Sequence, residues 1–140
     1  MTDKETYNFL GNRIIAAAFE VRKNTGPGLR EKYYEKALVF ELKQNGLEVK
    51  EQVAVPSIYK GIKIDDSFQA DIIVENKIIL EIKAMSCMME RETRQLITYL
   101  KLTGMKLGYL INFGALDFSI GNNFETYPYY NGIYRYVNNL

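Results

Sequence analysis

Three ionisable side chains occur at short spacing in an otherwise apolar stretch, residues 69–83. Asp71 is followed ten positions later by Glu81, and Lys83 comes two positions after that. Charged residues in so hydrophobic a segment require an explanation, because ionised groups are rarely buried without partners. Two carboxylates and an amine can hold a hard divalent cation, activate water and stabilise charge on a phosphate.

The residues that carry these groups are predicted to form a β-hairpin. Residues 69–74 and 78–83 are rich in isoleucine and are separated by a short polar segment, residues 75–77. Asn76 tolerates the left-handed backbone region that a three-residue hairpin loop often needs. We therefore predict a loop of three residues between the two strands.

This loop length determines which residues face one another. Val74 then lies opposite Ile78 and Asp71 lies opposite Glu81, so the two carboxylates share one face of the sheet. Lys83 shares that face because side chains alternate along a strand. A two-residue loop would instead turn Asp71 and Glu81 to opposite faces.

Two opposed carboxylates destabilise a strand pair unless a positive charge neutralises them. Lys83 supplies one charge, and Mg²⁺ or Mn²⁺ held by Asp71, Glu81 and the carbonyl of Ile82 would do so more fully. Lys83 could then orient an attacking water or help to deprotonate it. The alternative is a solvated sheet face on which Glu81 and Lys83 form an ordinary ion pair.

The composition excludes several other kinds of chemistry. The chain has no histidine, so serine–histidine triads, histidine-metal nucleases and two-histidine ribonucleases are excluded. A single cysteine, Cys87, makes neither an internal disulfide nor a zinc cluster. The net charge of +1 means that any contact with nucleic acid must come from a local basic patch.

The length of 140 residues predicts one domain, residues 1–140, with 47% apolar and 25% charged residues as in globular proteins. The first ten residues are too polar for a signal peptide, and no apolar run has the length of a membrane span. These features, with the lone cysteine, predict a cytoplasmic protein without membrane contact.

Hydrophobic spacing and turn signals predict helices and strands around the hairpin. The predicted order is α-α-β-β-β-α-β-β, an α/β or α+β fold with a mixed central sheet flanked by helices. Pro56 places the first strand near an edge or an end of the sheet. The expected helices are residues 7–23, 29–45 and 90–103, and the further expected strands are residues 47–58, 62–64, 106–113 and an edge strand within 127–137.

The spacing D-x9-E-x-K of Asp71, Glu81 and Lys83 resembles that of the PD-(D/E)XK nuclease superfamily. Residues 28–34, GLREKYY, are similar to the motif of the GxxExxY protein family within that superfamily. The resemblance covers roughly residues 10 to 137. It continues through residues 34–38, 59–61, 95–100, 108–114 and 132–135.

The resemblance implies a restriction-endonuclease-like core and metal-dependent cleavage of phosphodiester bonds. It implies Asp71 and Glu81 as metal ligands, Lys83 as the catalytic lysine, and Glu31 as a further acid that completes the cluster or binds a second ion. It also implies a site role for Gln95 on the helix after the second hairpin strand. Where the superfamily name has a proline, this chain has alanine at position 70, a change outside the chemistry.

Several of these residues also have simpler interpretations. Glu31 could be an acid near a helix start that favours the helix dipole. Glu35, one turn further along, competes with Glu31 for a role in the site. Tyr34, between them, is expected to pack or to support the site by a hydrogen bond.

Two other features of the sequence leave alternatives open. Residues Arg91, Arg94, Thr98 and Lys101 form one stripe on the predicted third helix, which could contact phosphates or simply face solvent. Five tyrosines between residues 127 and 136 could stack on unpaired bases or pack an edge strand into a dimer.

The expected function is that of a Mg²⁺- or Mn²⁺-dependent nuclease acting on nucleic acid, most readily DNA. Its partners would be nucleic acid and a second copy of the chain or another protein. The alternative is a catalytically silent module of the same fold that binds or assembles with a partner. A glycan hydrolase is disfavoured because nothing in the sequence marks a sugar-binding groove.

Overall fold

A six-stranded mixed sheet forms the centre of the computed structural model, which describes residues 1–65, 68–122 and 127–140. Its strand order is β1-β4-β5-β6-β8-β7, and β2 and β3 form a separate two-stranded hairpin. The helices are α1 (Asp3–Thr25), α2 (Glu31–Gln44) and α3 (Glu90–Thr103). The strands are β1 (Val49–Ala54), β2 (Ser57–Tyr59), β3 (Ile62–Ile64), β4 (Gln69–Val74), β5 (Ile78–Lys83), β6 (Leu107–Asn112), β7 (Asp117–Ile120) and β8 (Asn131–Val137).

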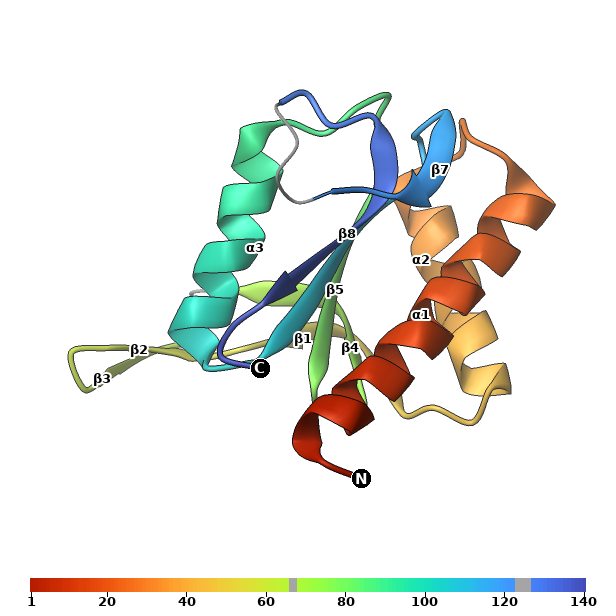
Figure 1. The fold of residues 1–140 in the computed structure, drawn as a ribbon. Helices are drawn as coiled ribbons and strands as arrows, with labels where there is room; N and C mark the ends of the chain where they lie inside the picture. The colour runs from red at the N-terminus through yellow and green to blue at the C-terminus, as the bar shows by residue number, and fades with distance from the viewer. Residues whose placement is uncertain (66–67, 123–126) are drawn as a thin grey trace.

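The helices cover the sheet on both faces (Figure 1). The side chains of α1 and α2 pack with Leu80 and Ile82 of β5 in one hydrophobic cluster. Leu96 and Leu100 of α3 pack with Ile79 in the other. Alternation along β5 therefore assigns Glu81 and Lys83 to the face that α3 covers. The mixed α/β fold class predicted from the sequence is confirmed.

The hairpin and the third helix have the predicted bounds, residues 69–74, 78–83 and 90–103. The predicted strand 47–58 is wrong in its length, because the chain leaves β1 at Ala54 and passes through Pro56 before β2 begins. Proline lacks the amide hydrogen that a continuous ladder requires, which explains the break.

The prediction of an edge strand near the C-terminus is also wrong. The strand β8 lies between β6 and β7, and β7 forms that edge of the sheet. Tyr129, Tyr134 and Tyr136 are accordingly buried. These three rings are core residues and are not available for stacking on bases or for dimer packing.

The corner between α1 and α2 is held by the buried side chain of Tyr34. Its hydroxyl donates a hydrogen bond to the carbonyl of Gly26 at 2.7 Å and accepts one from the amide of Leu29 at 3.1 Å. Its ring stacks on Phe113, with 4.8 Å between ring centroids. Tyr34 thus fixes the segment from which α2 starts, as expected for a supporting residue.

We expect Tyr34→Phe to lower the free energy of unfolding by about 1–2 kcal/mol, because it removes two partly buried hydrogen bonds of the Tyr34 hydroxyl. Urea denaturation measures this loss. Tyr33→Phe is the matched control, since the neighbouring Tyr33 side chain is 56% exposed. Equal midpoints for the two variants would contradict this role of the Tyr34 hydroxyl.

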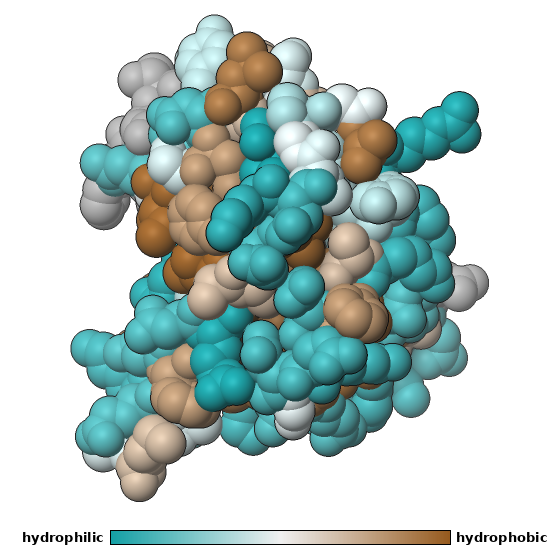
Figure 2. All heavy atoms as spheres, turned by 90° about the vertical axis from the view of Figure 1, so that its right-hand side faces the viewer, coloured by the Kyte–Doolittle hydropathy of each residue, from teal (hydrophilic) through white to brown (hydrophobic). Residues whose placement is uncertain are grey.

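Figure 2 shows the outer face that α1 and α2 form. Hydrophobic and hydrophilic side chains are interspersed on this face, and the exposed aromatic residues of the two helices include Phe9, Tyr33 and Phe40. The expected homodimer therefore gains no support from this face and stays a prediction. Within the described residues, no helix combines the length and the hydrophobicity needed to cross a bilayer.

Candidate active site

The hairpin β4–β5 has the predicted three-residue register. Val74 pairs with Ile78, and Ile72 pairs with Leu80. Glu75 and Asn76 have φ angles of 53° and 54°, the left-handed conformation that was expected of Asn76 alone. Extending this register brings Asp71 level with Glu81, which is the arrangement that the proposed chemistry requires.

The carboxylate of Asp71 lies between the two strands. Its Oδ2 accepts a hydrogen bond from the backbone amide of Ile82 at 2.8 Å. A side chain thus replaces the carbonyl that an ordinary ladder would offer to this amide. Asp71 is partly buried, so one carboxylate oxygen is fixed while the group remains within reach of solvent.

Glu81 is buried, with 8% of its surface exposed, and its Oε1 has no hydrogen-bond partner among the described residues. Burial, and next the negative charge of Asp71, raise the pKa of Glu81 to about 8, whereas Lys83 lowers it. Buried polar atoms normally have partners, so this oxygen is free to bind a ligand.

Glu31, at the first position of α2, joins the same electrostatic group. Although the Glu31 side chain is exposed to solvent, partial desolvation raises its pKa; Lys83 lowers this pKa, and Asp71 and Glu35 raise it. Lys83 therefore acts electrostatically on both Glu31 and Glu81. Charges on three separate elements thus influence one another at this site, namely those of Glu31, Asp71, Glu81 and Lys83.

Glu35 has a different environment from Glu31. It is buried, its Oε2 lies 3.2 Å from Nζ of Lys32, and its Oε1 accepts a hydrogen bond from Nε2 of Gln52 at 2.9 Å. Both of its oxygens thus have partners within the protein. Of Glu31 and Glu35, Glu31 is the better placed to supply a free oxygen.

No group of three or more histidine, cysteine, aspartate or glutamate side chains in the described residues is arranged to hold a metal ion. Asp71 and Glu81 supply two carboxylates from neighbouring strands, and Glu31 is an exposed third acid at the start of α2.

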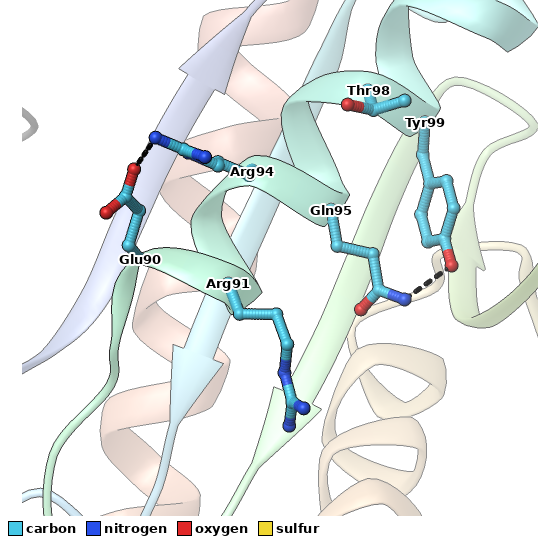
Figure 3. A pocket seen from close by; sticks show the side chains of 6 residues that line it. All are labelled: Glu90, Arg91, Arg94, Gln95, Thr98 and Tyr99. Carbon is cyan, nitrogen blue, oxygen red and sulfur yellow. Dashed lines mark hydrogen bonds and ion pairs between the residues drawn. The ribbon is translucent and has the colours of Figure 1, made fainter.

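Gln95 contacts the site through Tyr99. Its Nε2 donates a hydrogen bond to the hydroxyl of Tyr99 at 2.7 Å. Burial is the main cause that raises the pKa of Tyr99, and the negative charge of Glu81 raises it further. Tyr99 therefore lies within electrostatic range of the Glu81 carboxylate. Figure 3 shows Gln95 and Tyr99 extending from the same side of α3.

Sequence reasoning missed Asn112, the last residue of β6, which pairs with Lys83. Its Oδ1 accepts hydrogen bonds from the amides of Met85 at 2.9 Å and Gly114 at 3.1 Å, and its Nδ2 donates to the carbonyl of Met85 at 2.9 Å. It thereby fixes the loop that follows Lys83. A polar residue ending an apolar strand was the available signal.

We expect Asn112→Ala to lower the free energy of unfolding by about 2–4 kcal/mol, because three hydrogen bonds of a fully buried side chain are lost. Thermal and urea unfolding provide the measurement. Asn12→Ala, on the exposed side of α1, serves as the control and should change little. A similarly small effect at both positions would show that the three hydrogen bonds of Asn112 are dispensable for stability.

A family model described as the PD-(D/E)XK nuclease superfamily matches residues 8–122. The chain therefore belongs to that superfamily. Searches of curated proteins and of solved structures found no match.

Proposed function

We propose that the protein is a divalent-metal-dependent nuclease that hydrolyses phosphodiester bonds through Asp71, Glu81 and Lys83. The observation that carries this proposal is the buried, unpartnered oxygen of Glu81 beside the carboxylate of Asp71 and the amine of Lys83. A purely structural sheet would have little reason to bury a carboxylate without a partner. Membership of the superfamily supports the same chemistry.

The residues present fit a hard cation such as Mg²⁺ or Mn²⁺. Asp71 and Glu81 supply carboxylate oxygens, the carbonyl of Ile82 lies between Glu81 and Lys83 in sequence, and Glu31 provides a further acid at the rim. A cation bound there would lower the pKa of water and stabilise charge that develops on the phosphate.

Residues of the chain itself position the carboxylate, supply positive charge and border the site. The amide of Ile82 holds one oxygen of Asp71, so that the other points away from the backbone bond. Lys83 places a positive charge next to the carboxylates, where it can orient a water or hold a proton at its Nζ. Tyr99, whose hydroxyl accepts a hydrogen bond from Gln95, lies on the α3 side of the site near Glu81.

The proposal also assigns the chain to a family within the superfamily and names its substrate. The GLREKYY segment favours placement in the GxxExxY family, with Glu31 as its acidic residue. DNA is the favoured substrate, with RNA as the comparison. A catalytically silent module is the second candidate, because the described residues lack a preformed cluster of three acids.

Calorimetric titration with Mn²⁺ and Mg²⁺, followed by cleavage assays on DNA and RNA, tests the proposal. We expect metal binding and metal-dependent cleavage by the wild-type protein, and loss of both in Asp71→Ala. Cleavage that persists in Asp71→Ala would reject the assigned site. An absence of metal binding, together with a tight oligomer by native mass spectrometry, would favour the silent module.

A further inference from the structure

A shallow groove with a volume of about 570 Å³ runs along α3. Figure 3 shows Arg91, Gln95 and Tyr99 extending from one side of the helix, whereas Arg94 turns toward Glu90. The groove is lined by Glu90, Arg91, Arg94, Gln95, Thr98 and Tyr99.

The two arginines of the groove differ in how far they are engaged. Arg94 forms an ion pair with Glu90 one turn earlier in the helix. Arg91 is 91% exposed, and its ion pair within the described residues is a 3.9 Å contact with Glu92. That carboxylate also accepts a hydrogen bond from the amide of Met89 at the helix start. The guanidinium of Arg91 is therefore available to an anionic ligand.

Tyr99 links the groove to the proposed active site. It lines the groove, and burial first and then the charge of Glu81 raise its pKa. Lys101, which the sequence pattern grouped with the arginines, lines a different hollow beside Lys106 and Val137. The stripe predicted from the sequence is thus divided, and its arginines share their groove with Tyr99.

We propose that this groove binds the sugar–phosphate backbone of a nucleic-acid strand beside the bond to be cleaved, with Arg91 as the main phosphate contact. A planar guanidinium matches the geometry of a phosphate. Because the net charge of the chain is only +1, local contacts of this kind must supply the electrostatic attraction. This inference rests on the proposed nuclease function and adds the binding surface.

The test compares Arg91→Ala with Lys101→Ala, a matched loss of one charge from the same helix. Binding of labelled single strands of DNA and of RNA is measured in Ca²⁺ across a range of salt concentrations. We expect Arg91→Ala to weaken binding roughly 5- to 10-fold and to reduce the salt slope by about 0.7, the value for one phosphate contact on a single strand. Lys101→Ala should bind within about twofold of wild type on the same scale.

Hydrolysis of bis(p-nitrophenyl) phosphate with Mn²⁺, a substrate too small to reach the groove, separates the two proposals. Wild type should hydrolyse it, and Lys101→Ala should do so equally well. No hydrolysis by the wild-type protein would count against the nuclease function while leaving the binding comparison valid. Equal DNA and RNA affinities for Arg91→Ala and Lys101→Ala would overturn the groove proposal.

A second inference comes from an independent feature, the backbone of Gln52 in β1. Its φ angle is 50°, a left-handed conformation that is costly for a residue with a side chain and unusual inside a strand. Its neighbours Glu51 and Val53 pair with Ile72 and Ala70, so the register places Gln52 opposite Asp71.

This conformation directs the side chain of Gln52 to two acids. Its Nε2 lies 2.9 Å from Oε1 of Glu35 and 3.5 Å from Oδ1 of Asp71. The other oxygen of Asp71 is held by the amide of Ile82. We infer that Gln52 is a positioning residue that links the buried acid of α2 to Asp71 and restricts the rotation of that carboxylate.

Gln52→Gly tests this inference, with Asn76→Gly as a control that relieves a similar positive φ in the hairpin loop. In the metal-free protein we expect the Ile82 amide to exchange its hydrogen at least tenfold faster in Gln52→Gly and unchanged in Asn76→Gly. With Mn²⁺, Gln52→Gly should bind the ion roughly 5- to 20-fold more weakly.

Because amide exchange needs no metal, this result does not depend on the nuclease function. Glu35→Gln, which keeps an acceptor for Gln52, should preserve the Ile82 protection that Glu35→Ala loses. Unchanged Ile82 exchange in Gln52→Gly would show that Gln52 only bends the strand and would overturn the inference.

Discussion

Lys83→Met is expected to lower the rate of metal-dependent cleavage by at least about 100-fold, the usual loss when a group that transfers or orients a proton is removed. Methionine keeps most of the aliphatic side chain, so packing in β5 should be preserved. Metal affinity should stay the same or rise, because the positive charge next to Glu31 and Glu81 is removed.

The measurement is kcat with Mg²⁺ and Mn²⁺ together with metal affinity by calorimetry. Lys77→Met is the control, since it removes the same charge from the loop end of the hairpin. Unchanged kcat in Lys83→Met would remove Lys83 from the mechanism. A parallel loss of metal binding would reduce Lys83 to a structural residue.

Glu81→Gln is expected to stabilise the metal-free protein at neutral and alkaline pH while abolishing cleavage. The folded protein raises the pKa of Glu81 from 4.5 to about 8, chiefly by burial. Its neutral form therefore favours folding fully below about pH 4.5, and this contribution is lost as pH rises to about 8. At about 1.4 kcal/mol per pKa unit, the difference amounts to a few kcal/mol.

Urea unfolding between pH 4.5 and 9 checks this prediction. The gain in stability of Glu81→Gln over wild type should grow across the interval and level off above pH 8. Glu20→Gln, an exposed position on α1, should follow the wild-type curve. Mg²⁺ should raise the melting temperature of wild type and leave that of Glu81→Gln nearly unchanged. Parallel curves for wild type and Glu81→Gln would contradict the destabilising burial of this carboxylate.

The sequence was sufficient to predict the hairpin because the constraints there are local. The loop length sets the register, and the register decides whether Asp71 and Glu81 meet. The strand at residues 47–58 was predicted less well, because a single proline divided it. The position of β8 depended on the pairing of distant strands, about which period-two patterns carry no information.

The supporting residues were harder to predict than the acids. The positive φ angle of Gln52 directs its side chain to two acids. A glutamine within a strand pattern does not indicate such a backbone conformation. Asn112 acts through hydrogen bonds to a loop 27 residues earlier in the chain. Contacts of this kind are set by the tertiary fold, whereas Asp71, Glu81 and Lys83 are recognisable from their own spacing.

The parallel pairing of β5 with β6 has a consequence for the order of assembly. All four groups of the proposed site, Glu31 to Lys83, precede α3 in the chain, yet Glu81 is buried beside Leu110 of β6. Parallel strands pair only after the intervening crossover has been made. During synthesis, the acids therefore emerge from the ribosome first, but their low-dielectric surroundings are completed only after the next thirty or so residues have folded.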